Sequence, residues 1–135
     1  MLRLSTDAHL AMLAHAFDGL PLEACGLLEG DPATPSVDRF HPAHNDAASS
    51  KLYTVNPKDH LRADREAEDR GAELVGVMHS HTHTDAYPSP TDVAQAPDPS
   101  WHYIIVSLRY DQPVLRSYRI VDGEIHEEPV LVEDR

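Results

Sequence analysis

The segment that decides the fold reads Leu74-Val-Gly-Val-Met78-His79-Ser-His81-Thr-His83-Thr-Asp85-Ala-Tyr-Pro-Ser89-Pro-Thr-Asp92. Its first part is apolar and partly β-branched, which is typical of a central strand buried on both faces. The second part gathers histidines and acidic residues directly after that strand. Imidazole nitrogen and carboxylate oxygen are the ligands that hydrolytic zinc takes while it keeps one position open for water. The segment therefore predicts a metal site at the carboxyl end of a buried strand.

Three side chains of this segment are the predicted zinc ligands. Residues two apart on a strand point to the same face, with α-carbons about 6.5 to 7 Å apart, so His79 and His81 can converge on one ion. Ser89-Pro90 combines a helix cap with a first-turn proline and predicts a short helix from Pro90 to about Ala96. Asp92 then lies in the first turn of that helix, where it can supply the third ligand.

The same segment allows a second ligand set. A trio shifted along the chain would consist of His81, His83 and Asp85. We interpret His83 as a loop residue rather than a ligand, and Asp85 likewise. Removal of His83 should then leave zinc binding intact.

A hydrolytic zinc site also needs a carboxylate that takes the proton of the attacking water. Spacing alone does not select this base, because it need not be near the ligands in sequence. Glu23 is the candidate, at the beginning of the short apolar stretch Glu23-Ala-Cys-Gly-Leu-Leu-Glu29, which predicts a buried strand that ends at Gly30.

Length and composition limit the classes of function. The 135 residues are the size of one domain, 1–135. The net charge of −12 opposes binding to nucleic acid, and no basic patch compensates for it. One cysteine, Cys25, excludes an internal disulfide and a zinc ribbon. No apolar stretch is long enough for a membrane helix, and the first residues lack the apolar core of a signal peptide. We therefore expect a cytoplasmic protein. The sequence leaves an oligomer possible.

The rest of the chain predicts strands interrupted by about three helices, an α/β or α+β fold with a central mixed sheet. Residues 5 to 18 form an amphipathic pattern with Leu10, Leu13, Ala14 and Phe17 on the stripe that we expect to face the core. Asn56-Pro57 begins a charged, exposed helix over Lys58 to Arg70. The remaining predicted strands are Val37–His41, Leu52–Val55, Tyr103–Val106, and a hairpin of Val114–Val121 with Glu124–Val132 across Asp122-Gly123.

The spacing of these motifs resembles that of the JAMM metalloproteases, also called MPN-plus. The matching pattern is Glu23-Ala-Cys-Gly-Leu-Leu, then His79-Ser-His81, seven residues, Ser89, two residues and Asp92. The resemblance implies a single-domain MPN/JAMM fold, with an architecture like that of the cytidine deaminases. It also implies that His79, His81 and Asp92 hold one Zn²⁺, Glu23 orients and deprotonates the water, and Ser89 stabilises the oxyanion.

The likeness covers nearly the whole chain and is greatest to the bacterial Mec-type hydrolases. It includes Asn45-Asp-Ala-Ala-Ser, Tyr53-Thr-Val-Asn-Pro57 and Arg119-Ile-Val-Asp-Gly-Glu124. Mec-type enzymes remove cysteine from the C-terminal glycine of a ubiquitin-like sulfur-carrier protein in cysteine biosynthesis. The resemblance therefore implies a carrier partner with a Gly-Gly tail. Two departures bear on the substrate: most eukaryotic relatives have proline where Thr82 stands, and the general pattern does not require His83.

Three other functions share parts of this pattern. A zinc deaminase also uses a glutamate and a zinc-activated water, but its Pro-Cys-x-x-Cys ligands cannot be built from one cysteine. A non-catalytic MPN scaffold would not need the five site positions that this chain keeps. An isopeptidase or desampylase acting on lysine conjugates differs only in the leaving amine, and the sequence leaves this alternative open.

Overall fold

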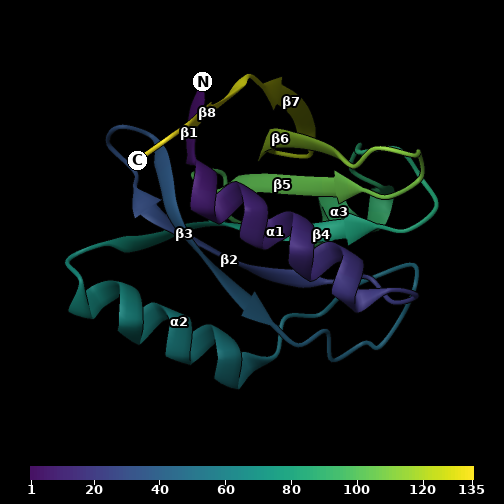
Figure 1. Cartoon of the computed structure of the whole chain (residues 1–135). Helices are drawn as coiled ribbons and strands as arrows, with labels where there is room; N and C mark the ends of the chain where they lie inside the picture. Colours follow the sequence, from purple (N-terminus) through teal and green to yellow (C-terminus); the bar gives the residue numbers. More distant parts are fainter.

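The computed structural model describes all residues from Met1 to Arg135 and contains three helices and eight strands (Figure 1). The helices are α1 (Thr6–Gly19), α2 (Pro57–Asp69) and α3 (Pro90–Ala94). The strands are β1 (Leu2–Ser5), β2 (Cys25–Asp31), β3 (Ser36–Ala43), β4 (Glu73–His81), β5 (His102–Ser107), β6 (Val114–Val121), β7 (Glu124–Glu128) and β8 (Val130–Glu133).

All eight strands form one mixed sheet in the order β7-β6-β5-β4-β2-β3-β1-β8. The central strand β4 pairs antiparallel with β2 and parallel with β5, as the predicted mixed sheet requires. The end strands β7 and β8 are separated in sequence by Pro129 alone. Because one residue cannot span a flat sheet of this width, the sheet curves until its two ends approach each other.

Helices α1 and α2 lie on opposite faces of this curved sheet. Helix α1 crosses the front of the sheet in Figure 1 and buries Ala8, Met12 and Ala16 in one apolar core cluster. Helix α2 packs on the other face beside β2, β3 and β4, where Ala63 joins the second cluster. The remainder of α2 is mostly exposed, as its charged sequence predicts. No helix has the length and apolar character that a membrane crossing demands.

The sequence prediction for α1 was right about the helix and wrong about its buried face. The stripe of Leu10, Ala14 and Phe17 is exposed, and Leu13 is half-buried. The buried stripe is instead Ala8, Met12 and Ala16, spaced four residues apart, which lets the helix approach the sheet closely.

Three strand predictions also need correction. The run Leu52–Val55 is extended but is not a sheet strand, since only Val55 forms an isolated bridge, with Asn45. The predicted strand Glu124–Val132 is two strands, because Pro129 interrupts it and β8 pairs with β1 instead of β6. Strand β2 begins at Cys25, so Glu23 precedes the strand that it was predicted to begin.

Candidate metal centre and active site

Three potential ligand atoms meet where β4 ends and α3 begins. His79 and His81 lie on one face at the end of β4, and Asp92 lies in the first turn of α3. His79 Nε2 lies 3.1 Å from His81 Nε2. Asp92 Oδ2 lies 3.1 Å from the first of these nitrogens and 3.0 Å from the second. All three side chains are buried. The structure thus places the three predicted ligands in one nearly equilateral triangle of nitrogen and oxygen atoms.

The chemistry of this triangle fits a zinc ion. Ligand atoms about 2.0 Å from tetrahedral zinc stand roughly 3.3 Å apart, close to the observed separations. His81 Nδ1 donates a hydrogen bond to the Asp85 carbonyl over 2.7 Å, which leaves the lone pair of Nε2 for the ion. When both Nε2 atoms are unprotonated, two lone pairs and a carboxylate oxygen face one another, and a cation between them would stabilise this arrangement.

The pKa shifts of the three side chains reflect their burial and their hydrogen bonds to one another. Burial lowers the pKa of His79 and keeps this imidazole neutral. Burial acts to raise the pKa of Asp92, but hydrogen bonds from His79 and His81 outweigh it and hold that pKa below its ordinary value. For His81, burial acts to lower the pKa, and its hydrogen bonds to Asp92 and to the Asp85 carbonyl raise it overall.

Glu23 lies beside the ligands because the residues that follow it are tied to β4. Ala24 donates its amide hydrogen to Ser80 Oγ over 2.8 Å and accepts one from the Ser80 amide over 2.9 Å. The Glu23 side chain is buried, and its Oε1 atom has no hydrogen-bond partner in the protein. Burial raises the pKa of this carboxyl to about 7, while the nearby His81 charge lowers it and Asp92 raises it further. A carboxylate with these properties is suited to take a proton from water near neutral pH.

Ser89 is the N-cap of α3 and is bonded to the ligand Asp92 in both directions. Its Oγ accepts the Asp92 amide hydrogen over 3.1 Å, and its own amide donates to Asp92 Oδ2 over 2.9 Å. The hydroxyl of Ser89 acts as an acceptor in this bond, so its hydrogen stays free to be donated elsewhere.

The loop between the histidines and Ser89 is held by hydroxyl groups from the neighbouring strands. Ser107 Oγ donates to the Thr84 carbonyl over 2.5 Å, and the Tyr118 hydroxyl donates to the carbonyl of Ala86. The Asp85 side chain accepts from the Tyr110 hydroxyl at 2.6 Å and is largely exposed. The structure does not assemble the shifted trio: His83 is exposed, and the three grouped ligands are His79, His81 and Asp92.

Sequence reasoning missed two contributors to the ligand geometry. Asp85 orients His81 through its main-chain carbonyl, and a main-chain contribution leaves no signal in residue type. The buried Tyr53 ring stacks on the His79 imidazole, with centroids 4.3 Å apart and planes 18° apart. Tyr53 is far from His79 in sequence, so only the folded chain reveals this contact.

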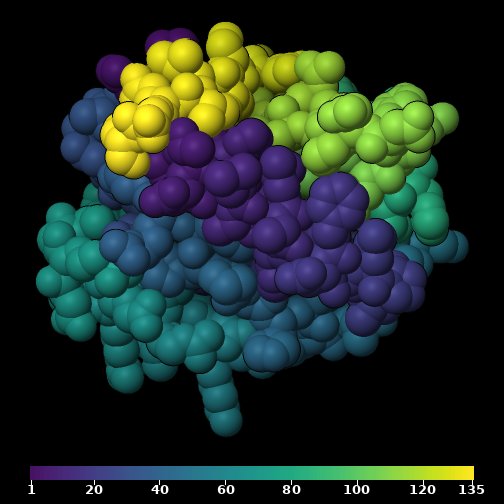
Figure 2. Space-filling model, in the orientation of Figure 1, coloured from purple at the N-terminus to yellow at the C-terminus, as the bar shows by residue number.

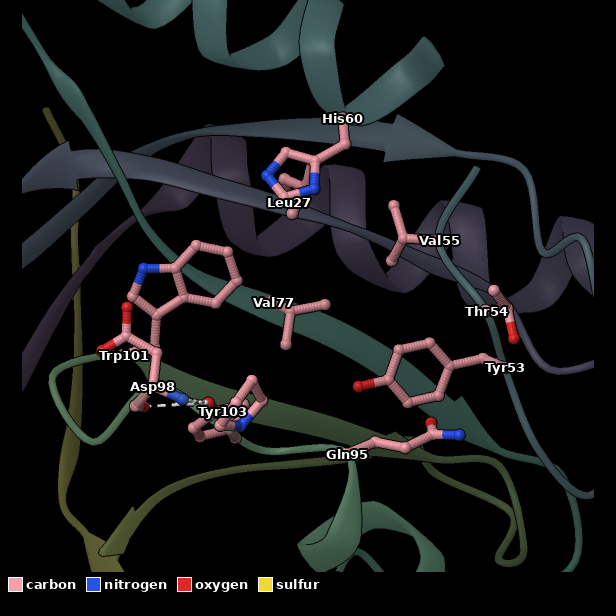
Figure 3. Close-up of a pocket in the computed structure, with 11 residues that line it drawn as sticks. Leu27, Tyr53, Thr54, Val55, His60, Val77, Gln95, Asp98, Trp101 and Tyr103 are labelled. Carbon is pink, nitrogen blue, oxygen red and sulfur yellow. Dashed lines mark hydrogen bonds between the residues drawn. The ribbon is translucent and has the colours of Figure 1, made fainter. Parts of the chain in front are cut away.

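An apolar pocket of about 430 Å³ (Figure 3) is lined by Tyr53, whose ring stacks on His79, and by Trp101. Its floor is the cross-strand row of Leu27, Val77 and Tyr103, and the adjacent row along the strands contains His79. Two residues of a strand separate the rows, about 6.7 Å. Tyr53 directs its hydroxyl into the pocket from one side, and Trp101 forms the opposite wall.

Comparison with known proteins adds relatives over the full length of the chain. A model of the prokaryotic homologs of the JAB domain matches residues 5–121. A CysO-cysteine peptidase of Mycobacterium tuberculosis is 43% identical over 133 residues, covering 98% of this chain and 91% of the relative. A desampylase of Haloferax volcanii is 36% identical over 111 residues, covering 78% of this chain and 80% of the relative.

Solved structures agree with this grouping. The solution structure of protein DSY2949 from Desulfitobacterium hafniense is similar with a TM-score of 0.91 and 35% identity, covering 100% of this chain and 94% of the other. A JAB1/MPN domain protein of Archaeoglobus fulgidus shares the fold, with a TM-score of 0.63 at 23% identity, over 97% of this chain and 99% of the other. The predicted MPN/JAMM fold is confirmed, and the chain belongs to the prokaryotic JAB-domain family.

Proposed function

We propose that this protein is a zinc-dependent hydrolase that cleaves the amide bond after the C-terminal glycine of a ubiquitin-like carrier protein and releases cysteine. One observation carries the proposal: a buried carboxylate without a hydrogen-bond partner, Glu23, lies beside a triangle of two imidazole nitrogens and one carboxylate oxygen. The 43% identity to a CysO-cysteine peptidase supports the choice of substrate. We infer that residues 1–135 act as one domain; the cytoplasmic location stays a prediction.

The roles of the ligands and of the base follow from their positions. His79, His81 and Asp92 would hold the zinc. Zinc bound there supplies Lewis acidity, which brings the pKa of water near neutrality and polarises the scissile carbonyl. Glu23 accepts the proton of the attacking water on its free Oε1 atom and passes it to the nitrogen of the leaving amine.

Ser89 would stabilise the oxyanion that forms when water adds to the carbonyl. Its hydroxyl hydrogen is not used within the chain, since Oγ accepts the amide hydrogen of Asp92. This bond to the backbone fixes the side-chain oxygen, so the donor needs no reorganisation during the reaction. A fixed donor of this kind typically lowers the barrier by about 3 to 4 kcal/mol.

The carrier tail would bind along the extended segment Tyr53–Val55. Hydrogen bonds to Asn45 and its neighbours use the Thr54 amide and carbonyl, whereas the amide and carbonyl groups of Tyr53 and Val55 make none within the chain. These groups can pair with an added extended strand. The edges of the main sheet, β7 and β8, lie several strands from β4, so they are not suited to guide a tail to the ligands.

A Gly-Gly end suits this path because the cross-strand row that contains His79 is closed in by buried side chains, which leaves no space for the side chains of larger residues. An extended chain advances about 3.3 Å per residue, so a tail with its last glycine at the ligands reaches the row of Val77 two residues earlier. The first side chain before the two glycines would then meet the apolar pocket between Tyr53 and Trp101. The proposal thus includes a bulky apolar residue at the third or fourth position from the scissile bond.

Cleavage of lysine isopeptides is the second candidate, favoured by the 36% identity to a desampylase. The test offers the zinc-loaded protein a carrier with a C-terminal cysteine, and in parallel a carrier joined to a lysine side chain, with products identified by mass spectrometry. We expect release of cysteine, with no release by Glu23→Gln. Preferred cleavage of the lysine conjugate would select the second candidate, and a zinc-loaded protein that cleaves neither would be a scaffold.

A further inference from the structure

The two histidines of the ligand triangle are held in different ways. A histidine that binds a metal through one ring nitrogen carries a hydrogen on the other, and it almost always donates this hydrogen to an acceptor. His81 follows this rule, since its Nδ1 lies 2.7 Å from the Asp85 carbonyl oxygen. His79 departs from it, because its Nδ1 is buried and has no hydrogen-bond partner in the chain. Another contact must therefore set the orientation of the His79 imidazole.

The surroundings of His79 explain why its Nδ1 finds no acceptor. The cross-strand partners of this residue are Cys25 on β2 and Ile105 on β5, and both are fully buried. They belong to the apolar cluster that contains Ala63 of α2, on the face of the sheet opposite the purple helix α1 that crosses the front of Figure 2. The torsion that turns an imidazole ring has broad minima. Apolar strand neighbours alone therefore do not fix the direction of Nε2.

The Tyr53 ring supplies a contact that depends on this torsion. It is 7% exposed and stacks on the His79 imidazole, with centroids 4.3 Å apart and planes 18° apart. Rotation of the imidazole would tilt it out of the stack, and the same rotation would carry its Nε2 away from the atoms of His81 and Asp92. The stack and the ligand triangle are therefore satisfied by the same orientation of His79.

Tyr53 is itself held from both sides by one carboxamide group. Asn45 Nδ2 donates to the Leu52 carbonyl over 3.0 Å, and Asn45 Oδ1 accepts the Thr54 amide hydrogen over 2.9 Å. The same Nδ2 also donates to the Glu23 carbonyl over 3.0 Å. The residues on either side of Tyr53 and the main chain of the proposed base are thus bonded to a single side chain. This arrangement makes the Tyr53 ring a fixed support.

We propose that Tyr53 is a positioning residue whose ring, by stacking, holds His79 in the orientation that zinc requires. The stack takes the place of the hydrogen bond that Nδ1 lacks. This role rests on the proposed function, in which His79 is a zinc ligand. The Tyr53 hydroxyl has no part in it, since it points into the pocket in Figure 3. The ring should therefore be required for zinc binding, and the hydroxyl should not.

The zinc affinities of three variants test the proposal. Tyr53→Leu removes the ring, and we expect it to bind zinc about 10- to 100-fold more weakly, the usual effect of losing a group that orients a ligand. Tyr53→Phe keeps the ring and should bind zinc as tightly as the wild type. Trp101→Leu is the matched control, because it removes an aromatic ring from the opposite wall of the same pocket and should leave the affinity unchanged. Competition with a chromophoric chelator measures each affinity.

Two spectroscopic measurements separate positioning from a general loss of stability. The absorption bands of Co²⁺ bound in place of zinc depend on ligand geometry, and they should change in Tyr53→Leu but not in Tyr53→Phe. In NMR spectra of the zinc-loaded wild type, the ring protons of His79 should lie upfield of those of His81, because they face the Tyr53 ring. The NMR measurement needs no variant, so it decides the question even where Tyr53→Leu does not fold.

Three results would overturn the proposal. The first is wild-type zinc affinity with an unchanged Co²⁺ spectrum in folded Tyr53→Leu. The second is an equal loss of affinity in Tyr53→Leu and Tyr53→Phe, and the third is the absence of an upfield shift at His79. Retention of zinc by His79→Ala would overturn it together with the ligand set. None of these measurements involves a carrier, so a zinc-loaded protein that releases no cysteine would contradict the proposed reaction alone.

Discussion

Ser89 and Asp92 form a reciprocal pair in which each backbone amide donates to the other's side chain. The carboxylate oxygen that accepts the Ser89 amide hydrogen is the one that faces the two histidines. The helix cap, the proposed third ligand and the proposed oxyanion donor are therefore one rigid unit. A substitution of Ser89 or Asp92 should therefore also change the position of the other side chain.

Ser89→Ala should separate the two roles of this serine. Loss of the hydroxyl donor is expected to lower kcat about 100- to 1,000-fold. Loss of the cap should cost about 1 kcal/mol of stability. Zinc should remain bound, since none of the three ligands is changed. Steady-state kinetics on a carrier-cysteine substrate, thermal unfolding and metal analysis of the same preparation provide the measurements.

Ser5→Ala is the matched control for this prediction. Ser5 caps α1 in the same manner, with its Oγ accepting the Ala8 amide hydrogen over 3.2 Å, but it lies away from the ligands. The control should lose stability and keep its kcat. If both variants lose activity equally, the effect of Ser89 is that of a cap alone.

Glu23→Gln should abolish catalysis while zinc stays bound, because an amide cannot accept the proton of water. The same change should alter stability in a pH-dependent way in the metal-free protein. Burial raises the pKa of Glu23 from an ordinary 4.5 to about 7, so the folded state holds this proton more tightly than the unfolded state. Ionisation of Glu23 therefore destabilises the fold increasingly as pH rises from about 4.5 to about 7.

The metal-free Glu23→Gln protein should accordingly be more stable than wild type at pH 8, by at most about 3 kcal/mol, and nearly equal to it at pH 4. Urea denaturation at the two pH values measures the difference. Glu68→Gln, at an exposed position of α2, serves as the control and should show no such divergence. Equal stabilities of Glu23→Gln and wild type at pH 8 would contradict the burial argument.

Zinc content should distinguish the two sets of histidine-segment ligands. Asp92→Asn and His79→Ala are expected to lose the metal, since each removes one corner of the ligand triangle and neither residue belongs to the shifted trio. His83→Ala should keep one zinc per chain, because His83 is exposed and outside the triangle. Metal analysis after dialysis provides the measurement, and loss of zinc from His83→Ala would reverse the assignment.

Trp101→Ala should weaken recognition of the carrier tail without affecting the chemical step. Removal of one wall of the apolar pocket is expected to raise KM about tenfold for a carrier with a bulky apolar residue before its two glycines, with kcat nearly unchanged. Phe17→Ala removes an exposed aromatic ring from the other face and is the control. A fall in kcat at unchanged KM would show that the pocket does not bind the tail.

Local sequence signals predicted the elements whose partners are near in sequence. The Asp122-Gly123 turn is one example, since both residues adopt the positive φ angles, 51° and 79°, that such a hairpin needs. Strand β8 shows the limit of this reasoning. Its partner β1 is at the other end of the chain, so no local pattern indicated that Pro129 ends one strand pairing and begins another.

Helix α1 shows a second limit. It carries apolar residues on two faces, and hydrophobic periodicity cannot choose between them. The buried stripe contains two small residues, Ala8 and Ala16, on either side of the fully buried Met12, and Leu10 and Phe17 lie outside. Some residues of the candidate site could likewise be predicted from local sequence, and one could not. His79, His81 and Asp92 could be proposed from spacing, whereas Glu23 was selected by family resemblance, because only tertiary contacts through Ser80 bring it near.

The pairing of β1 with β8 predicts that the protein resists force applied through the two ends of the chain. The two terminal strands are parallel neighbours, with Leu2 opposite Val130 and Ser5 opposite Glu133. Tension applied between the two ends of the chain therefore pulls the strands past each other and loads their hydrogen bonds together, in shear rather than one at a time. An unfolding ATPase that pulls on one end of the chain would therefore meet its largest barrier at the first step. In single-molecule experiments, unfolding the protein through its two termini should require more force than separating β6 from β7 at the open end of their hairpin.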